Sequence, residues 1–436
     1  MRILMLAQFY PPIMGGIERH VQDLGAALAA RGHQVSVATL WHKELPEFEM
    51  DGAVQVYRIR GTMQRFTSLF TTEQQHSPPF PDPEVTFALH RVIAQVRPEI
   101  VHAHNWIIRS FLPLKTWSGA KLVMTLHDCE LTCVEMRMMY RDTQLCSGPA
   151  LTKCLDCAAH HYGFSKGTLT LFSNWAMAGF DRSLVDLFLP VSHAIAEANH
   201  LMDTRALVHV VPNFVPDDVA AVSDEIDPRL AQLPPNGFIL QVGELVYDKG
   251  TGVLLDAYAG LDSAPPLVLI GRRINGAFTD LPSNVIALES LPHALVMQAW
   301  RQSLFGTVAS LCLDACPTVT IEAMASGRPM IGSSIGGITD QIVDGETGFL
   351  VPPGDAAALR QAMARLIADP TLRARMGEAA RRKSIEFQAS AVIKRIEQSY
   401  QELVEGRTQG NDYKVSMTDH ADIRNRFQAR HQEEKI

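Results

Sequence analysis

Two carboxylates eight residues apart are the first feature of the chain that could carry chemistry. Asp314 precedes a segment predicted to be helical, and Glu322 lies within it. Pro317 suits the first turn of that helix, because its missing N–H costs nothing there. The first N–H groups of a helix lack internal partners, so a phosphate could lie on the amides of Thr318 and Val319. Apolar neighbours of Glu322 favour a partly buried, partnered carboxylate over a solvated one.

Lys249 could supply a positive charge to the same ligand. It precedes Gly250 in a loop that follows a predicted strand, residues 238–242. In open α/β sheets ligands bind at the carboxyl ends of the strands, where a lysine can hold a phosphate. The alternative is a surface lysine in a turn.

The pair Gly15-Gly16 lies between a predicted strand and a predicted helix. Backbone N–H groups at such a helix start favour an anion. The spacing matches neither G-x-G-x-x-G nor G-x-x-x-x-G-K-[ST], which disfavours a nicotinamide or P-loop site. A turn that needs a positive φ is the alternative.

Histidines follow or occupy other strands. His127 comes directly after the predicted strand 122–126, at the edge where a sugar or oxyanion could be contacted. A histidine satisfied by local backbone is the alternative. His102 and His104 share one face of a strand, but two ligands do not make a metal site.

Five of the seven cysteines lie between residues 129 and 157. Four of them have the spacing C-x12-C-x7-C-x2-C, which suits a structural zinc or an iron–sulfur cluster; they are Cys133, Cys146, Cys154 and Cys157. Four reduced thiols in a loop are the alternative. The odd total fits a reducing cytoplasm better than a disulfide framework.

The elements that must position these residues form two similar series. Strand, loop, helix and strand follow one another at 3–7, 17–31 and 35–40, and again at 238–242, 253–261 and 267–270. This order is typical of right-handed βαβ units. We therefore expect two α/β domains, joined by a proline-rich linker around residues 211–235.

Length and composition agree with a globular protein of two or three domains. The chain has 436 residues, a net charge of −8, 47% hydrophobic and 20% charged residues. The acidic balance disfavours general nucleic-acid binding. No apolar run reaches the ~18–20 residues that span a bilayer, and the N-terminal apolar stretch is read as a strand rather than a signal peptide.

Taken together, the motifs make the chain similar to a known family. From about residue 1 to 400 it resembles the retaining family 4 glycosyltransferases of GT-B fold (glycosyl transferases group 1). The resemblance is carried, in the family's order, by Gly15-Gly16 with Glu18, 31–35 (RGHQV), 102–104 (HAH), 125–128 (TLHD), 211–213 (VPN), Lys249-Gly250, 322–329 (EAMASGRP), Gly336-Gly337 and 344–348 (DGETG).

The resemblance implies an α/β GT-B fold, with two Rossmann-like parallel-sheet domains facing each other across a cleft and a C-terminal helix that crosses back. The domains expected are 1–213, on the acceptor side and with a cysteine-containing insertion at 129–160, and 214–385, which binds the nucleotide-sugar. The returning helix is expected at 386–405, and a polar tail at 406–436.

The resemblance also implies a nucleoside-diphosphate sugar donor. Glu322 would hold the ribose hydroxyls, Lys249 the diphosphate, and the Thr318 and Val319 amides would assist. Asp314, with the Cys316 and Pro317 backbone, would face the donor sugar.

From the first domain, Gly16 would close over the diphosphate and His127 would approach the reacting carbon. No metal and no dedicated base would be needed for catalysis, because the leaving diphosphate accepts the acceptor's proton.

The function expected is transfer of a hexose-type sugar from a UDP- or GDP-sugar to a glycan or lipid-linked acceptor, in polysaccharide or glycolipid biosynthesis in the cytoplasm. A place at the inner face of the membrane stays open, since 57–60 and 64–70 mix arginines with aromatics. Two departures from the family keep an inactive sugar-nucleotide-binding subunit as an alternative: Asp314 stands where the family usually has Glu, and Glu244 where it often has Arg. A GT-B-fold sugar-nucleotide epimerase, which needs no acceptor, is a further alternative.

Overall fold

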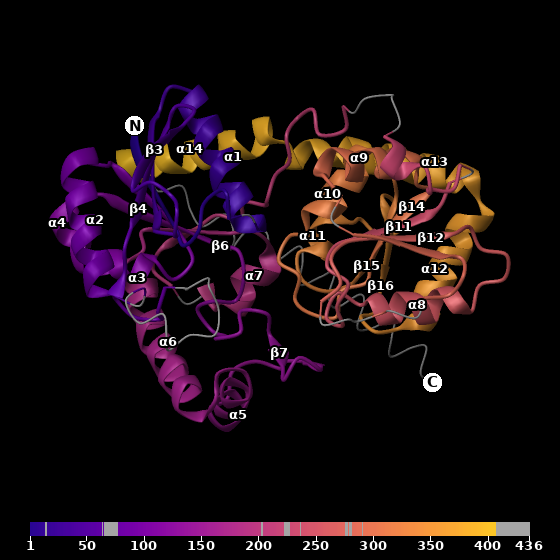
Figure 1. Cartoon of the computed structure of the whole chain (residues 1–436), viewed down its shortest axis with the longest axis horizontal. Coiled ribbons are helices and arrows are strands. Elements are labelled where there is room, and N and C mark those ends of the chain that lie inside the picture. The colour runs from indigo at the N-terminus through magenta and orange to yellow at the C-terminus, as the bar shows by residue number, and fades with distance from the viewer. Residues whose placement is uncertain are drawn as a thin grey trace. The chain divides into compact units, whose positions relative to one another are not determined.

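The computed structural model describes residues 1–13, 15–62, 64, 77–201, 204–221, 227–235, 237–274, 278, 281–289 and 291–406. These residues form two compact units. The first unit comprises Met1–Val134, Thr168–Val211 and the described residues from Arg395 onwards, and the second comprises Glu135–Gly167 and Pro212–Lys394. Figure 1 shows a sheet flanked by helices in each unit.

The first unit is built on an eight-stranded sheet in the order β10-β9-β6-β5-β1-β2-β4-β3. All neighbours are parallel except β3 and β4. The strands are β1 (Arg2–Ala7), β2 (Gln34–Leu40), β3 (Phe48–Asp51), β4 (Val54–Ile59), β5 (Ile100–His104), β6 (Lys121–Leu126), β9 (Leu187–Pro190) and β10 (Leu207–Val208). Central strands such as β1 and β5 are almost wholly buried, because helices cover parallel sheets on both faces.

Helices of the first unit connect these strands. They are α1 (Gly16–Ala30), α2 (Pro83–Val96), α3 (Ile108–Phe111), a 3-10 turn at Leu112–Leu114, α4 (Lys115–Ser118), most of α6 (Phe164–Leu184), α7 (His193–Ala198) and the end of α14 (Ala389–Glu405). Asp82 caps α2 by accepting from the amides of Glu84 and Val85, and Ser192 caps α7.

The second unit has a six-stranded, wholly parallel sheet in the order β13-β12-β11-β14-β15-β16. Its strands are β11 (Ile239–Val242), β12 (Leu267–Ile270), β13 (Val285–Leu288), β14 (Phe305–Val308), β15 (Met330–Ser333) and β16 (Gly348–Val351). Its helices are α8 (Thr251–Ala259), α9 (His293–Gln302), α10 (Thr318–Ala325), α11 (Ile338–Gln341), α12 (Ala356–Ala368) and α13 (Pro370–Ser384), with 3-10 turns at Pro228–Leu230 and Ile385–Phe387.

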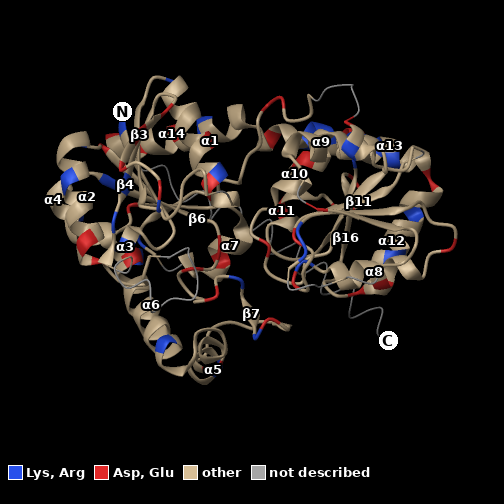
Figure 2. Cartoon of the chain, viewed as in Figure 1, with Lys and Arg blue, Asp and Glu red and all other residues tan. Residues whose placement is uncertain are grey.

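The core of the second unit lies between this sheet and helices α8, α12 and α13. Ile239, Leu267 and Phe305 from the strands pack with Leu254 of α8 and Met363 of α12. Charged side chains lie mainly on helices and loops, whereas the strands are largely free of them (Figure 2).

The segment Glu135–Gly167 groups with the second unit, although the cysteine-containing insertion was expected in the N-terminal domain. It holds a small hairpin of β7 (Met139–Tyr140) and β8 (Gln144–Leu145), helix α5 (Leu151–Tyr162) and the start of α6. The unit boundary at 211/212 is close to the predicted 213/214, and α14 passes to the first unit from Arg395. Residues 407–436, most of the predicted tail, lie outside the described residues.

The suggestion of a membrane-facing basic and aromatic segment at 57–60 is wrong for two of its residues. Tyr57 and Arg58 lie in β4 and are buried. The Arg58 guanidinium donates to Glu49 of β3 and to the carbonyl of Pro11, which explains why it points inward. The remainder of that prediction, 65–70, lies outside the described residues. None of the described helices is both long enough and apolar enough to span a bilayer.

Candidate functional site

An ion pair links the carboxyl ends of two neighbouring strands in the second unit. Lys249 lies between β11 and α8, and Asp314 lies between β14 and α10. The Lys249 Nζ is 2.8 Å from Asp314 Oδ2, and the Ser310 hydroxyl donates to the same oxygen at 2.9 Å. Burial acts to lower the pKa of Lys249, but the Asp314 carboxylate outweighs it, and the net pKa is raised. Lys249 is therefore a cation over the whole physiological range.

Two glycines let the loops around this pair approach closely. Gly250 has φ +70°, and a Cβ there would lie 1.8 Å from the carbonyl oxygen of Ala309. Gly336 has φ +61°, and its Cβ would lie 2.2 Å from the carbonyl oxygen of Asp314. The Gly337 amide donates to that same carbonyl at 2.7 Å. The motif Gly336-Gly337 thus positions Asp314, because no other residue fits so close a backbone approach.

Glu322 lies on α10 and is 5% exposed. Its Oε1 is 2.9 Å from Nε2 of His293, the first residue of α9. The expectation of a buried, partnered carboxylate is confirmed. The partner, His293, lies 29 residues upstream of Glu322 and was not predicted. The sequence signal that could have pointed to His293 is its place at the start of a helix that follows strand β13.

The N-terminus of α10 is braced by side-chain amides. Pro317 is the N-cap rather than a residue of the first turn, and Thr318 and Val319 begin the helix. Gln341 donates to the carbonyl of Pro317 at 3.1 Å, and Asn213 donates to the carbonyl of Cys316 at 3.0 Å. The Pro317 carbonyl also accepts from the Thr320 amide at 3.2 Å, so both of its lone pairs are already used.

Glu244, the departure from the family pattern, is paired. Its Oε1 is 2.7 Å from Nη2 of Arg272, and both side chains are exposed. Arg273 pairs with Glu289 at 3.1 Å. Glu244 therefore holds a guanidinium at the loop where the family often has an arginine.

In the first unit, His127 belongs to a cluster of imidazoles. His104 ends β5, and its Nδ1 is 3.0 Å from Nε2 of His127, which follows β6. The ring of His20 from α1 lies 4.9 Å from that of His127. Burial lowers the pKa of His20 to about 4 and that of His104 well below its usual value. Each of these two is a neutral imidazole at physiological pH.

The same three histidines each bring one nitrogen within 4.8 Å of the others, which is a group that could hold a metal ion. Two of the rings already hydrogen-bond to each other. His102 takes no part in this group: it contacts the hydroxyls of Thr125 and of Tyr400 in α14, at 2.7 and 2.6 Å.

Gly15 and Gly16 lie at the start of α1, as predicted. Gly15 has φ −139°, and Gly16 is absent from the glycines with positive φ, so a positive-φ turn is not what requires the pair. A Cβ on Gly16 would meet no described atom within 4 Å. The space beside Gly16 can therefore admit a ligand.

The four predicted cysteine ligands are divided between the units. Cys133 belongs to the first unit, and Cys146, Cys154 and Cys157 to the second. Burial raises the pKa of the Cys157 thiol, because desolvation disfavours the thiolate. Each thiol contacts a backbone group within its own segment. Among the described residues, the group whose ligand atoms all lie within 4.8 Å of one another is that of the three histidines, so the structure does not bring these thiols together as metal ligands. A metal on the cysteines stays a prediction.

The family model for Glycosyltransferase Family 4 matches residues 14–219, and that for Glycosyl transferases group 1 matches residues 223–383. The two models follow one another along the chain, and the chain belongs to the glycosyltransferases that they describe.

Two curated relatives match the chain over most of their own length. It is 24% identical over 420 residues to a glycogen synthase of Mycobacterium tuberculosis, covering 88% of this chain and 90% of the relative. It is 25% identical over 413 residues to a phosphatidyl-myo-inositol mannosyltransferase of Mycobacterium leprae, covering 90% and 96%.

Solved structures show the same fold. Sucrose-phosphate synthase from Thermosynechococcus elongatus superposes with a TM-score of 0.70 at 21% identity, covering 93% of this chain and 99% of that one. Anabaena HepE in complex with UDP-glucose superposes with a TM-score of 0.64 at 18% identity, covering 92% and 99%. The glycosyltransferase therefore has the α/β GT-B fold with two Rossmann-like parallel-sheet domains.

Proposed function

We propose that this glycosyltransferase moves a hexose-type sugar from a nucleoside-diphosphate sugar to a glycan or lipid-linked acceptor in polysaccharide or glycolipid biosynthesis. The observation that carries the proposal is the arrangement at the carboxyl edge of the second sheet. A lysine, an aspartate and a buried glutamate lie on loops and a helix that follow its strands.

Each group has a role that its chemistry supports. Lys249 neutralises the diphosphate, and the first amides of α10, at Thr318 and Val319, assist it. Glu322, oriented by His293, accepts from the ribose hydroxyls. Asp314 accepts from hydroxyls of the donor sugar and keeps Lys249 in place until the donor arrives.

The first unit supplies the groups for the sugar's reacting end. His127 approaches the reacting carbon as a hydrogen-bonding imidazole, held by His104. Gly16 admits the diphosphate, since its Cβ position is open.

The transfer is proposed to retain the configuration of the sugar and to need no metal. Attack and departure then occur on one face, and the leaving diphosphate accepts the acceptor's proton. The enzyme works by holding the reactants and by stabilising charge on the leaving group. Lys249 is the principal cation, and Arg272 assists it, although its pairing with Glu244 offsets part of its charge.

Incubation of the purified chain with radiolabelled UDP- and GDP-sugars and an extract of glycan and lipid acceptors tests the proposal. We expect label in the acceptor fraction and stoichiometric nucleoside diphosphate. Conversion of the sugar nucleotide without an acceptor would point to an epimerase, and donor binding without turnover would point to an inactive subunit.

A further inference from the structure

Helix α6 buries polar side chains beside Leu171 and Ala178 and exposes several large apolar ones. Its buried side chains include polar ones, because Asn174 and Asp181 are both 0% exposed. Its exposed side chains include Leu169, Phe172 and Phe180, at 60, 48 and 56%. A helix on the surface of a water-soluble domain normally shows the reverse.

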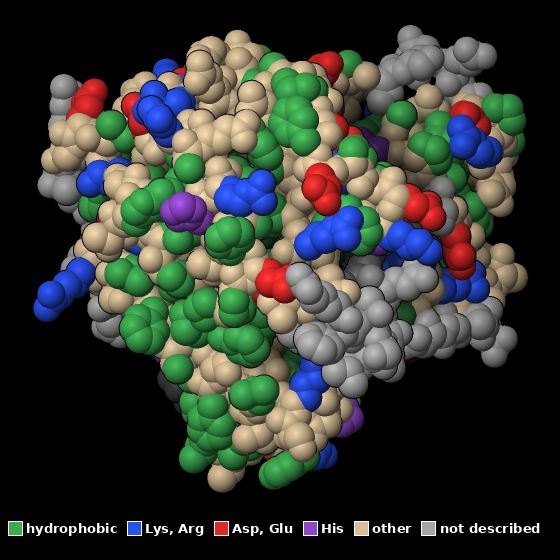
Figure 3. Space-filling view, turned by 60° about the vertical axis from the view of Figure 1, so that its left-hand side comes forward, with side chains coloured by type: hydrophobic (Ala, Val, Ile, Leu, Met, Phe, Trp, Pro, Cys, Tyr) green, Lys and Arg blue, Asp and Glu red, His purple; other side chains and the backbone are tan. Residues whose placement is uncertain are grey.

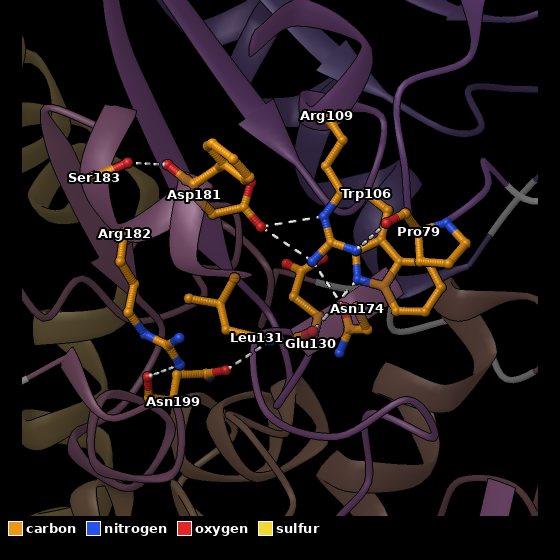
Figure 4. Close-up of polar contacts among 11 residues, drawn as sticks. Pro79, Trp106, Arg109, Glu130, Leu131, Asn174, Asp181, Arg182, Ser183 and Asn199 are labelled. Carbon is orange, nitrogen blue, oxygen red and sulfur yellow. Dashed lines mark hydrogen bonds and ion pairs between the residues drawn. The ribbon is translucent and has the colours of Figure 1, made fainter. Parts of the chain in front are cut away.

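The buried polar face is held by one arginine. Arg109 of α3, itself fully buried, contacts Asp181 Oδ2 through Nε and Nη2 at 3.1 and 3.0 Å. It also donates to Asn174 Oδ1 at 2.7 Å and to the Pro79 carbonyl at 3.0 Å. Figure 4 shows these bonds converging on the guanidinium. The network fixes which face of α6 points inward, because a rotated helix would leave the buried Arg109 without its carboxylate partner.

The exposed apolar residues form one stripe. At about 100° per residue, Leu169, Phe172, Ala176 and Phe180 fall within about 80° of one another around the helix axis. The stripe runs for about 16 Å along the axis, at ~1.5 Å per residue. The lower part of Figure 3 shows hydrophobic side chains gathered without an acidic one among them.

The charges of α6 suit an anionic partner. Its only carboxylate is Asp181, which is buried and paired with Arg109. Lys166 is exposed, whereas Arg182 points inward and donates to the Asn199 carbonyl at 3.1 Å (Figure 4). The outer face of α6 therefore carries a lysine and no carboxylate of its own.

We propose that the outer face of α6 docks on an anionic lipid bilayer, with the helix in the plane of the surface and the stripe inserted between headgroups. An exposed apolar stripe with a lysine and no exposed carboxylate on the same helix suits the interface of an anionic bilayer. A second copy of the chain fits less well, because two such faces would bring like charges together. The proposal goes beyond the proposed function: a chain that binds vesicles and transfers no sugar would refute that function alone.

Co-sedimentation with vesicles tests this docking. We expect the full chain to bind phosphatidylcholine vesicles that contain phosphatidylglycerol. The triple variant Leu169→Ser/Phe172→Ser/Phe180→Ser should lower the partition coefficient at least about tenfold, since three apolar side chains lose their burial. The matched control Phe48→Ser/Met50→Ser/Phe87→Ser removes three equally exposed apolar side chains from β3 and α2, and should leave binding unchanged.

A single charge reversal measures the electrostatic contribution to vesicle binding separately from the apolar one. Lys166→Glu should weaken binding to the anionic vesicles about fivefold and leave the weak binding to phosphatidylcholine alone unchanged. Thermal unfolding of each variant shows that it is folded. Equal partition of wild type and triple variant, or a wild type that binds no vesicle, would overturn the proposal. Self-association that the triple variant abolishes, without vesicle binding, would assign the stripe to a second copy.

Discussion

Replacing Lys249 with methionine tests the role of the ion pair in the second unit. The substitution keeps the aliphatic stem and removes the charge that lies 2.8 Å from Asp314. Two effects follow, one on donor affinity and one on stability, and they can be measured separately.

The loss of affinity can be worked from the hydrogen bond that the ammonium would give to the diphosphate. A bond to a charged group contributes about 1.5–3 kcal/mol, so the dissociation constant of the nucleoside diphosphate should rise roughly 10- to 150-fold. The loss of stability should be smaller, about 1 kcal/mol or less. The side chain of Lys249 is 37% exposed, so water screens the pair, and Ser310 still donates to Asp314.

Isothermal titration with nucleoside diphosphates, together with urea unfolding, measures both effects. Lys394→Met is the matched control, because Lys394 is an exposed residue of α14 outside the site. In Lys249→Met/Asp314→Asn no unpaired carboxylate is left, so stability should recover while diphosphate affinity stays low.

Two results would refute this reasoning. Diphosphate affinity within twofold of wild type in Lys249→Met would show that the lysine does not bind the ligand. Recovery of affinity together with stability in the double variant would show that Lys249 only serves to hold Asp314.

Four further predictions follow from single contacts. Glu322→Gln should weaken nucleoside diphosphate binding about tenfold and leave pyrophosphate binding unchanged in titrations, because the residue acts on the ribose. Arg272→Ala should weaken diphosphate binding in titrations, and Glu244→Gln should strengthen it. Wild-type affinity for diphosphate in both variants would contradict a phosphate-binding role for this loop. Burial raises the pKa of Asp128 to about 7, so near pH 6 the folded chain keeps a proton that the unfolded chain has lost. As the pH rises from ~4 to ~7, the melting temperature of the wild type should therefore lose ground to that of Asp128→Asn, because the buried histidines and Glu130 are present in both chains and only the Asp128 contribution differs. Tyr400→Phe leaves His102 Nδ1 without its 2.6 Å partner and should cost about 1–3 kcal/mol in urea unfolding, whereas an unchanged midpoint would show that this contact does not hold α14.

Much of the fold follows from local pattern. The apolar runs of β1, β6 and β11 and the periodic helix α1 could be predicted because parallel strands buried on both faces read as continuous hydrophobic segments. The positions of Lys249 and His127 at strand ends follow from the same pattern, since ligand-binding loops lie at the carboxyl edge of such sheets.

The rest depends on contacts between distant residues. His293 and Glu322 are 29 residues apart, and Arg109 and Asp181 are 72 apart, so no local spacing reveals either pair. Helix α6 has apolar residues on both faces and buries Asn174 and Asp181 on the inner one, so hydrophobic periodicity alone does not tell which side faces water. The error at Arg58 has the same origin, because its partner Glu49 lies on another strand.

Thermal unfolding in the presence of UDP, GDP, ADP and dTDP, each beside its sugar conjugates, tests the central claim most directly. A ligand at ~100 times its dissociation constant adds about 2.7 kcal/mol to the stability of the folded chain. The account predicts that one base stabilises the wild type, that its sugar conjugate stabilises it further, and that Lys249→Met loses most of both effects. A folded wild type that responds to none of these nucleotides would contradict a nucleotide-sugar site at the second sheet.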